Sequence, residues 1–294
     1  MVRASRPGSR TRIDSLRFML SGMDCHSDWI IPDWPAPAVV RAVFTTRMGG
    51  VSSAPFDSMN LGAHVGDGAG AVQANRDFLQ RAIGTRAVFL EQVHGNKVLA
   101  ITTQTADGQT ADASITDRRK LACTIMVADC LPVLLATEAG DAVAAAHAGW
   151  RGLAGMGENP GDGIVESVYA SFSALAKAGR AQAAIKTIAW LGPCIGPGAF
   201  KVGAEVKAAF VSVSPAAARF FVAIGPGKYL ADLPALARLR LQALGINEIY
   251  GNDGSAAWCT ASNPSRFFSH RRDAAIGGNG FGATGRMAAC IWLE

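Results

Sequence analysis

The segment LACTIMVADCLPVLLAT, residues 121–137, is followed after a Glu-Ala-Gly-Asp turn by DAVAAAHAG, residues 141–149. The first segment is apolar and contains several β-branched residues, which predicts a buried strand. Cys130 lies inside it, and Pro132 disturbs its hydrogen-bond ladder because proline has no amide hydrogen. The second segment predicts the next strand. We therefore predict a hairpin that brings Cys130 and His147 to one end.

The rest of the chain supplies further strands and helices. Apolar, β-rich runs predict strands at residues 38–46, at 87–102 (two segments around a polar break), and at 185–197, 246–251 and 286–294. Helical spacing of apolar residues predicts helices at residues 71–83, 163–178, 203–213 and 230–245. Strands dominate the first half of the chain and helix–strand units the second. This order favours a single α+β domain with mixed β-sheets.

Composition narrows the class of protein. The chain has 294 residues, of which 49% are hydrophobic and 17% charged, as in an ordinary globular protein with a substantial core. No uninterrupted apolar run reaches the roughly 18 residues of a membrane span, so we expect no membrane partner. The formal net charge is +5, and part of it lies in the N-terminal tail. We therefore expect no nucleic-acid partner.

The first 22 residues form a basic tail, which we predict to be disordered and to precede a single catalytic domain at residues 23–294. It has no apolar core of the length that a secretory signal needs, which leaves a transit peptide or an upstream start codon before Met23. The six cysteines are scattered through a large chain. Without an export signal, they predict reduced thiols and a cytoplasmic location.

Two histidines and a cysteine form a candidate metal site. His94 lies at the polar break between two predicted strand segments, and Cys130 and His147 lie on the predicted hairpin. Three such ligands suit a catalytic zinc ion with water in the fourth position, and zinc lowers the pKa of that water to about 7. The same atoms suit a hydrolase in which Cys130 is the nucleophile and His147 its base. Alternatively, Cys130 is a small buried apolar residue.

Copper and anion binding are two further functions to consider. A multicopper oxidase needs many imidazoles, and this chain has five histidines with no close pair, which argues against a copper cluster. A single copper ion is compatible with the site in vitro, since copper binds such ligands tightly. Arg47, Arg151 and Arg271 lie in glycine-rich or polar loops. Their forked guanidinium groups suit phosphate, although a solvated surface arginine is the alternative for each.

Several motifs in order resemble one family: FTTRMGGVSSAPFDSMNLGAHVGD, EQVHGNKV, VADCLPVLL, AAHAGWRG, LGPCIGPGAF, CTASNPSRFFSHRRD and TGRMAACIWL. The chain resembles the polyphenol oxidase or laccase-domain family, whose members are described as purine nucleoside phosphorylases with adenosine deaminase activity. The resemblance runs from Val40 to Leu293. Two segments, residues 152–166 and 271–286, are longer than the family pattern.

The resemblance implies one zinc ion per chain on His94, Cys130 and His147. We predict Cys130 and His147 as the catalytic residues. It implies an α/β/β/α layered fold, a cytoplasmic setting, phosphorolysis of adenosine, inosine, guanosine and methylthioadenosine, and deamination of adenosine. Purine nucleosides and phosphate are then the partners, and the protein is a monomer or homodimer. The substrate and phosphate contacts that we predict are Arg47, Asn60, Arg151 and Arg271. The alternatives are a copper-dependent phenol oxidase, and a Cys–His hydrolase or editing enzyme that acts on cell-wall nucleotide-peptide precursors.

Overall fold

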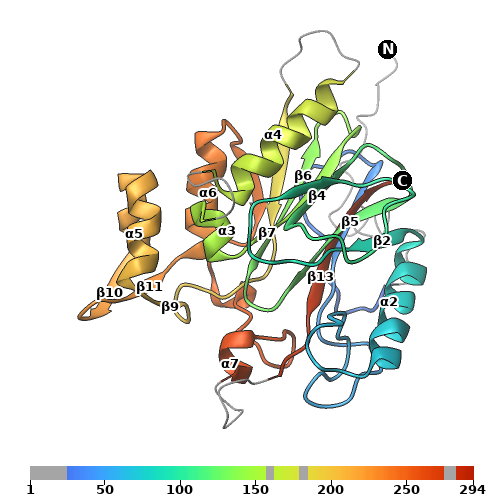
Figure 1. The fold of residues 1–294 in the computed structure, drawn as a ribbon, viewed down its shortest axis with the longest axis horizontal. Helices are drawn as coiled ribbons and strands as arrows, with labels where there is room; N and C mark the ends of the chain where they lie inside the picture. The colour runs from blue at the N-terminus through green and yellow to red at the C-terminus, as the bar shows by residue number, and fades with distance from the viewer. Residues whose placement is uncertain (1–24, 157–161, 179–184, 275–282) are drawn as a thin grey trace, which may run out of the picture.

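Two β-sheets lie face to face at the centre of the molecule, and helices cover their outer faces (Figure 1). This computed structural model describes residues 25–156, 162–178, 185–274 and 283–294. The tail at residues 1–22 lies outside the described residues, as do residues 157–161 and 275–282 of the two longer segments. The predicted α+β class, the layered arrangement and the single domain are confirmed.

The first sheet has four strands. Its order is β1 (Val40–Phe44), β13 (Met287–Leu293), β5 (Leu121–Val127) and β2 (Arg86–Phe89). The last strand of the chain, β13, lies between β1 and β5 and is antiparallel to both, whereas β2 is parallel to β5. Residues from both ends of the chain therefore share this sheet.

The second sheet has six strands. Its order is β12 (Glu248–Gly251), β8 (Thr187–Leu191), β6 (Leu131–Thr137), β7 (Val143–Ala148), β4 (Ala113–Thr116) and β3 (Val98–Ala100). The central strand β6 is antiparallel to both β7 and β8, while the outer pairs β12–β8 and β3–β4 are parallel. The predicted β6–β7 hairpin is confirmed, with Pro132 opposite His147.

The prediction of one strand over residues 121–137 was wrong. The segment forms two strands, β5 and β6, which belong to different sheets. The chain crosses between the sheets at residues 128–130, where Asp129 has a left-handed backbone with φ of 89°. Every residue of β5 and β6 is buried, so the apolar composition continues across the break and conceals it.

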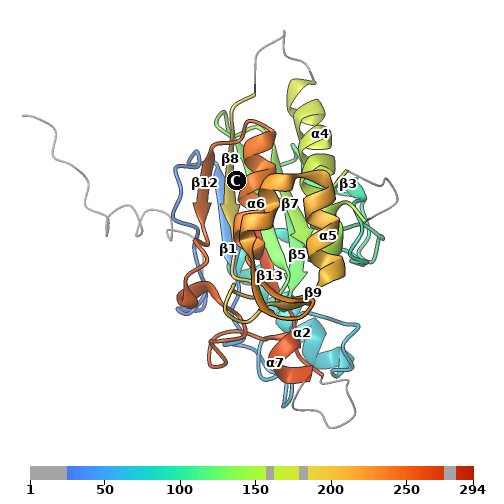
Figure 2. The same ribbon diagram turned by 90° about the vertical axis from the view of Figure 1, so that its left-hand side faces the viewer.

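Side chains along each strand point alternately to the two faces of its sheet, so neighbouring residues pack in different layers. In β5, Cys123 and Ile125 pack between the two sheets, whereas Ala122 and Met126 face the layer of α2 (Ala69–Ile83). In β6, Leu134 faces the other sheet, and its neighbours pack in the cluster formed with the helices on the far side. Those helices are α4 (Ile164–Lys177) and α6 (Leu233–Ala243), which lie side by side in Figure 2.

A smaller sheet extends one end of this frame. It has the order β10 (Phe221–Gly225), β11 (Lys228–Ala231), β9 (Lys201–Gly203), and α5 (Ala204–Val213) lies beside it (Figure 1). The remaining short helices are α3 (Trp150–Ala154), α7 (His270–Ala274) and the two 3-10 helices η1 (Pro215–Phe220) and η2 (Ala256–Trp258). Within the described ranges, no helix combines the length and the apolar character needed to cross a membrane.

Candidate metal centre and its cavity

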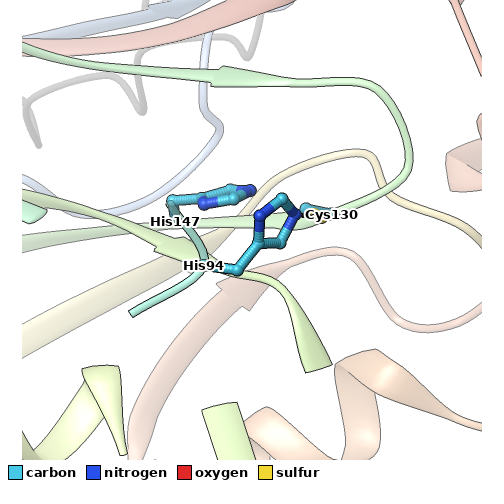
Figure 3. Close-up of side chains that lie close together, drawn as sticks. All are labelled: His94, Cys130 and His147. Carbon is cyan, nitrogen blue, oxygen red and sulfur yellow. Dashed lines mark hydrogen bonds between the residues drawn. The ribbon is translucent and has the colours of Figure 1, made fainter. Parts of the chain in front are cut away.

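The structure brings the three predicted ligands together from separate parts of the chain (Figure 3). His94 comes from the loop between β2 and β3, Cys130 from the crossing between the sheets, and His147 from β7. One ligand atom from each side chain lies within 4.8 Å of the others. Among the described residues, this is the only such group of three histidine, cysteine or acidic side chains.

A buried carboxylate fixes the loop that carries His94. His94 has a φ of 62°, a left-handed conformation that costs energy for a residue with a side chain. Asp112, which is fully buried, accepts the backbone N–H groups of three consecutive residues: Val93 at 3.2 Å, His94 at 2.9 Å and Gly95 at 2.7 Å. These bonds hold the strained turn and with it the direction of the His94 ring.

The same carboxylate orients His147. Asp112 Oδ1 lies 2.8 Å from His147 Nδ1, and both side chains are buried. Because Nδ1 donates its hydrogen to the carboxylate, Nε2 is the atom left to bind a metal. His94 Nε2 lies 3.6 Å from Cys130 Sγ, and the two imidazole rings are 4.7 Å apart and 67° inclined. A nitrogen–sulfur–nitrogen donor set with a carboxylate behind one imidazole fits a zinc ion.

Cys130 and His147 change each other's proton affinity. Burial disfavours the Cys130 thiolate, but the charge of His147 and hydrogen bonds from both histidines outweigh it and lower the pKa of Cys130 to about 6. Burial likewise disfavours a charged His147. The Cys130 thiolate and the Asp112 carboxylate outweigh that effect and raise the pKa of His147 to about 9. Without metal, the pair is therefore a thiolate and an imidazolium at neutral pH.

In the metal-free protein, iodoacetamide is expected to alkylate Cys130 with a rate that rises through about pH 6, since only the thiolate reacts. The core thiols Cys123 and Cys290 should stay unlabelled, because burial raises the pKa of each to about 12. Peptide mass spectrometry after timed labelling measures each site. The His147→Ala variant should shift the Cys130 profile upward, and an unshifted profile in that variant would contradict the pairing.

Asp129 connects the Cys130 turn to the cationic segment at the start of α7. Its carboxylate accepts the Thr260 hydroxyl at 2.5 Å and the Arg271 backbone N–H at 2.6 Å. Its backbone carbonyl accepts the Ile195 N–H at 2.9 Å. Asp129 thus holds one of the predicted anion-binding arginines near the ligand loop.

Two glycines after His147 allow α3 to approach the metal ligands. A Cβ atom on Gly149 would lie 2.7 Å from His94 Cδ2 and 3.1 Å from Cys130 Sγ. A Cβ on Gly152 would lie 2.7 Å from the Gly95 carbonyl oxygen. The glycines of the AHAGWRG stretch are therefore required by the close packing of the ligand loops.

The three ligands line a cavity of about 980 Å³. Its lining combines cationic, acidic and apolar side chains. The cationic and imidazole side chains that line it are His64, Lys201, Lys228, His270, Arg151, Arg271 and Arg286. The apolar contributors are Met126, Val127, Ala128, Trp150, Ile195, Phe200, Val202, Val206, Ile224, Pro226 and Leu233.

Two of the four predicted substrate contacts lie outside this lining. Arg47 is held by Asp57, whose carboxylate and backbone carbonyl both accept from it, and by the carbonyl of Pro264. Asn60 is fully buried, and its amide bonds to Gly62 and other residues of the surrounding loops. Both side chains therefore form hydrogen bonds within these loops. Arg151 and Arg271 do line the cavity, and Trp150, whose ring lies 4.7 Å from the Arg151 guanidinium, packs partly against the core.

Sequence reasoning missed Asp112, His64 and Arg286. Asp112 carried a weak signal, an acid directly before a strand. His64 and Arg286 stand inside two of the motifs that carry the resemblance, so their motifs were noted while the residues were not. What distinguishes all three is their position around the cavity and its ligands.

The family of the chain follows from comparison with known proteins. Residues 41–294 match the family described as multi-copper polyphenol oxidoreductase laccase. A purine nucleoside phosphorylase of Pseudomonas aeruginosa is 45% identical over 267 residues, which cover 90% of this chain and 98% of that protein. The purine nucleoside phosphorylase YfiH of Escherichia coli is 44% identical over 269 residues, which cover 91% and 99%.

Solved structures agree with this assignment. A crystal structure of a Neisseria meningitidis protein matches with a TM-score of 0.79 at 44% identity, covering 91% of this chain and 100% of that one. YlmD from Geobacillus stearothermophilus matches with a TM-score of 0.76 at 29% identity, covering 92% and 98%. With the family match spanning nearly the whole described chain, this protein belongs to the multi-copper polyphenol oxidoreductase laccase family.

Proposed function

We propose that this protein is a zinc-dependent purine nucleoside phosphorylase that also deaminates adenosine. The observation that carries the proposal is the His94–Cys130–His147 group, which lies in the wall of a cavity also lined by arginines. The volume of about 980 Å³ is at the upper end of the range, about 300–1,000 Å³, of small-molecule sites. Relatives with 44–45% identity carry the name purine nucleoside phosphorylase.

A zinc ion on these three ligands would supply a Lewis acid and water activated near neutral pH. The chain's own residues prepare the site for it. Asp112 keeps the hydrogen of His147 on Nδ1, so that Nε2 points to the centre, and it holds the His94 turn in place. The low pKa of Cys130 means that its thiolate is available as a ligand at neutral pH.

In phosphorolysis, a phosphate oxygen forms a bond to ribose C1′ while the bond between C1′ and the purine nitrogen breaks. The products are ribose-1-phosphate and the free purine base. Arg151 and Arg271 would attract phosphate into the cavity, since guanidinium groups form charge-assisted hydrogen bonds with phosphate oxygens. In deamination, a water oxygen bonds to purine C6 and the amino group leaves as ammonia, so adenosine becomes inosine.

Incubation of the zinc-loaded protein with adenosine and phosphate is expected to yield adenine, ribose-1-phosphate, inosine and hypoxanthine. Without phosphate, inosine alone should form, because phosphorolysis lacks its second substrate. Chromatography that resolves these products measures both reactions. The matched blank is the same protein after full removal of the metal, and product levels equal to that blank would contradict the proposal.

A Cys–His hydrolase is the second candidate, and the proton affinities of the pair favour it. A thiolate beside an imidazolium is the arrangement of a cysteine nucleophile with its acid–base partner. Cell-wall nucleotide-peptide precursors are the substrates proposed for this alternative. Activity that survives complete chelation would select it over the zinc mechanism.

A copper-dependent phenol oxidase is the third candidate, and the description of the family supports it. The metal group has two imidazoles and one thiolate, a set that also binds copper. If phenol oxidation were the physiological activity, purified protein would oxidise phenols faster than it cleaves nucleosides.

We place the reaction in the cytoplasm. None of the six cysteines, which all lie in the described ranges, forms a disulfide, as expected of a protein kept in a reducing compartment.

A further inference from the structure

Arg286 is fixed in place directly before β13, on the wall of the cavity. Its backbone N–H donates to Asn60 Oδ1 at 2.9 Å, and its carbonyl accepts the Leu61 N–H at 3.0 Å. Its side-chain stem packs on Gly62, where an added Cβ would lie 2.7 Å from Arg286 Cγ. Asn60, which we predicted as a substrate contact, accepts the backbone N–H of this arginine.

One side of the Arg286 guanidinium is used within the protein and the other is not. Nη1 donates to the carbonyls of Thr284 at 3.0 Å and Gly285 at 3.2 Å. In the part of the chain that the structure describes, Nε and Nη2 have no hydrogen-bond partner, and the side chain lines the cavity. The edge formed by Nε and Nη2 binds two oxygens of a phosphate or carboxylate side by side.

His64 and Arg286 both line the cavity, and Gly62, two residues before His64, packs against the Arg286 side-chain stem. Burial, together with the positive charges of Arg286 and Arg76, lowers the pKa of the His64 imidazole. The ring is therefore neutral at pH 7, with one N–H to donate and one lone pair to accept. No hydrogen bond joins it to any other residue in the described ranges.

The metal centre is near as well. Burial lowers the pKa of Arg286, and the negative charges of Cys130 and Asp129 act in the opposite direction. The next residue, Met287, pairs with Val127 of β5, three residues before Cys130, so the arginine lies on the side of the cavity that holds the ligands. An anion bound by Arg286 would thus be close to the reacting centre.

We infer that Arg286 and His64 form the phosphate subsite, in which Arg286 binds two phosphate oxygens and His64 donates its N–H to a third. The exposed side chains of Arg151 and Arg271 attract the anion, and the anchored Arg286 sets its position. The identification of the anion as inorganic phosphate rests on the proposed phosphorylase activity. The anchoring of Arg286 and the free edge of its guanidinium do not depend on that activity.

The test compares two reactions of the same protein. In zinc-loaded Arg286→Gln, the KM for phosphate in inosine phosphorolysis should rise about 10- to 100-fold, the loss of one or two charge-assisted hydrogen bonds. Adenosine deamination in phosphate-free buffer needs no phosphate and should change less than about threefold. His64→Asn should raise the KM for phosphate by a smaller factor. An unchanged KM for phosphate in Arg286→Gln would overturn the proposal.

A matched control and a second variant test whether the effects of Arg286→Gln come from general damage to the protein. Arg118→Gln removes an arginine that is 65% exposed and pairs with Asp117 away from the cavity, and it should leave both reactions unchanged. Arg286→Lys keeps the charge and the stem but cannot bind two oxygens side by side, so its KM for phosphate should still rise at least about threefold. If Arg286→Gln fails to fold or to hold zinc, the Lys variant decides, and wild-type phosphate kinetics in it would refute the subsite.

Direct binding separates this inference from the proposed function. Calorimetric titration of inorganic phosphate into the zinc-loaded protein should give a Kd that rises at least about tenfold in Arg286→Gln and stays constant in Arg118→Gln. Phosphate binding that depends on Arg286 without any phosphorolysis would refute the function and leave the subsite standing. Phosphorolysis together with phosphate binding that does not depend on Arg286 would refute the subsite and leave the proposed function standing.

Discussion

Cys130→Ser is expected to release the metal and to lower both phosphorolysis and deamination more than about 100-fold. Loss of a residue that only supports a ligand costs about 10- to 100-fold in metal affinity or activity, so loss of a ligand should cost more. A serine hydroxyl remains protonated at neutral pH and cannot replace the thiolate, whose low pKa depends on His147. Metal content by mass spectrometry and the two product assays measure the effect.

Cys25→Ser is the matched control for this prediction. Cys25 is half-buried like Cys130, lies outside the metal group and does not line the cavity. It should retain full metal content and both activities. A Cys130→Ser protein that keeps stoichiometric zinc but loses activity would contradict ligation and favour the thiolate as a nucleophile.

The candidate ligands could be found in the sequence because each interrupts an apolar run. His94 stands in the polar break between two strands, and Cys130 and His147 stand near the ends of buried strands. A buried strand gains nothing from polar side chains at its end unless they are paired, so such positions indicate a site. The sequence did not indicate that the chain changes sheets at Asp129. A left-handed backbone at an aspartate leaves no mark in composition when both flanking strands are fully buried.

The substrate contacts were less predictable because a loop arginine has no fixed partner in sequence. Arg47 and Arg286 both stand in motifs of the family resemblance. Only the fold shows that the Arg47 guanidinium donates hydrogen bonds to the Asp57 carboxylate and to two backbone carbonyls. The Arg286 guanidinium, in contrast, has one edge without a hydrogen-bond partner among the described residues. Pairing between segments more than 200 residues apart, as between Asn60 and Arg286, decides which cation is available to a ligand.

Asp112→Asn is expected to weaken zinc binding by about 10- to 100-fold and to lower both activities with it. The carboxylate accepts four donors: Oδ1 serves His94 N–H and His147 Nδ1, and Oδ2 serves the N–H groups of Val93 and Gly95. An amide nitrogen donates and cannot accept. In either orientation of an asparagine, two of the four buried donors therefore lose their acceptor, at about 1–3 kcal/mol each.

The two orientations of the introduced amide have different consequences, and zinc affinity distinguishes a positioning role from a purely structural one. If the amide nitrogen faces Val93 and Gly95, the turn loosens and the His94 ring loses its direction. If it faces His147, that imidazole no longer needs its hydrogen on Nδ1, and Nε2 becomes protonated part of the time and unable to bind zinc.

Competition with a chromophoric chelator measures the zinc affinity, and thermal unfolding measures the stability. Asp117→Asn, at an exposed carboxylate paired with Arg118, controls for the change of charge and should match wild type in both. A folded Asp112→Asn protein with wild-type zinc affinity would show that this carboxylate stabilises the fold without orienting the ligands.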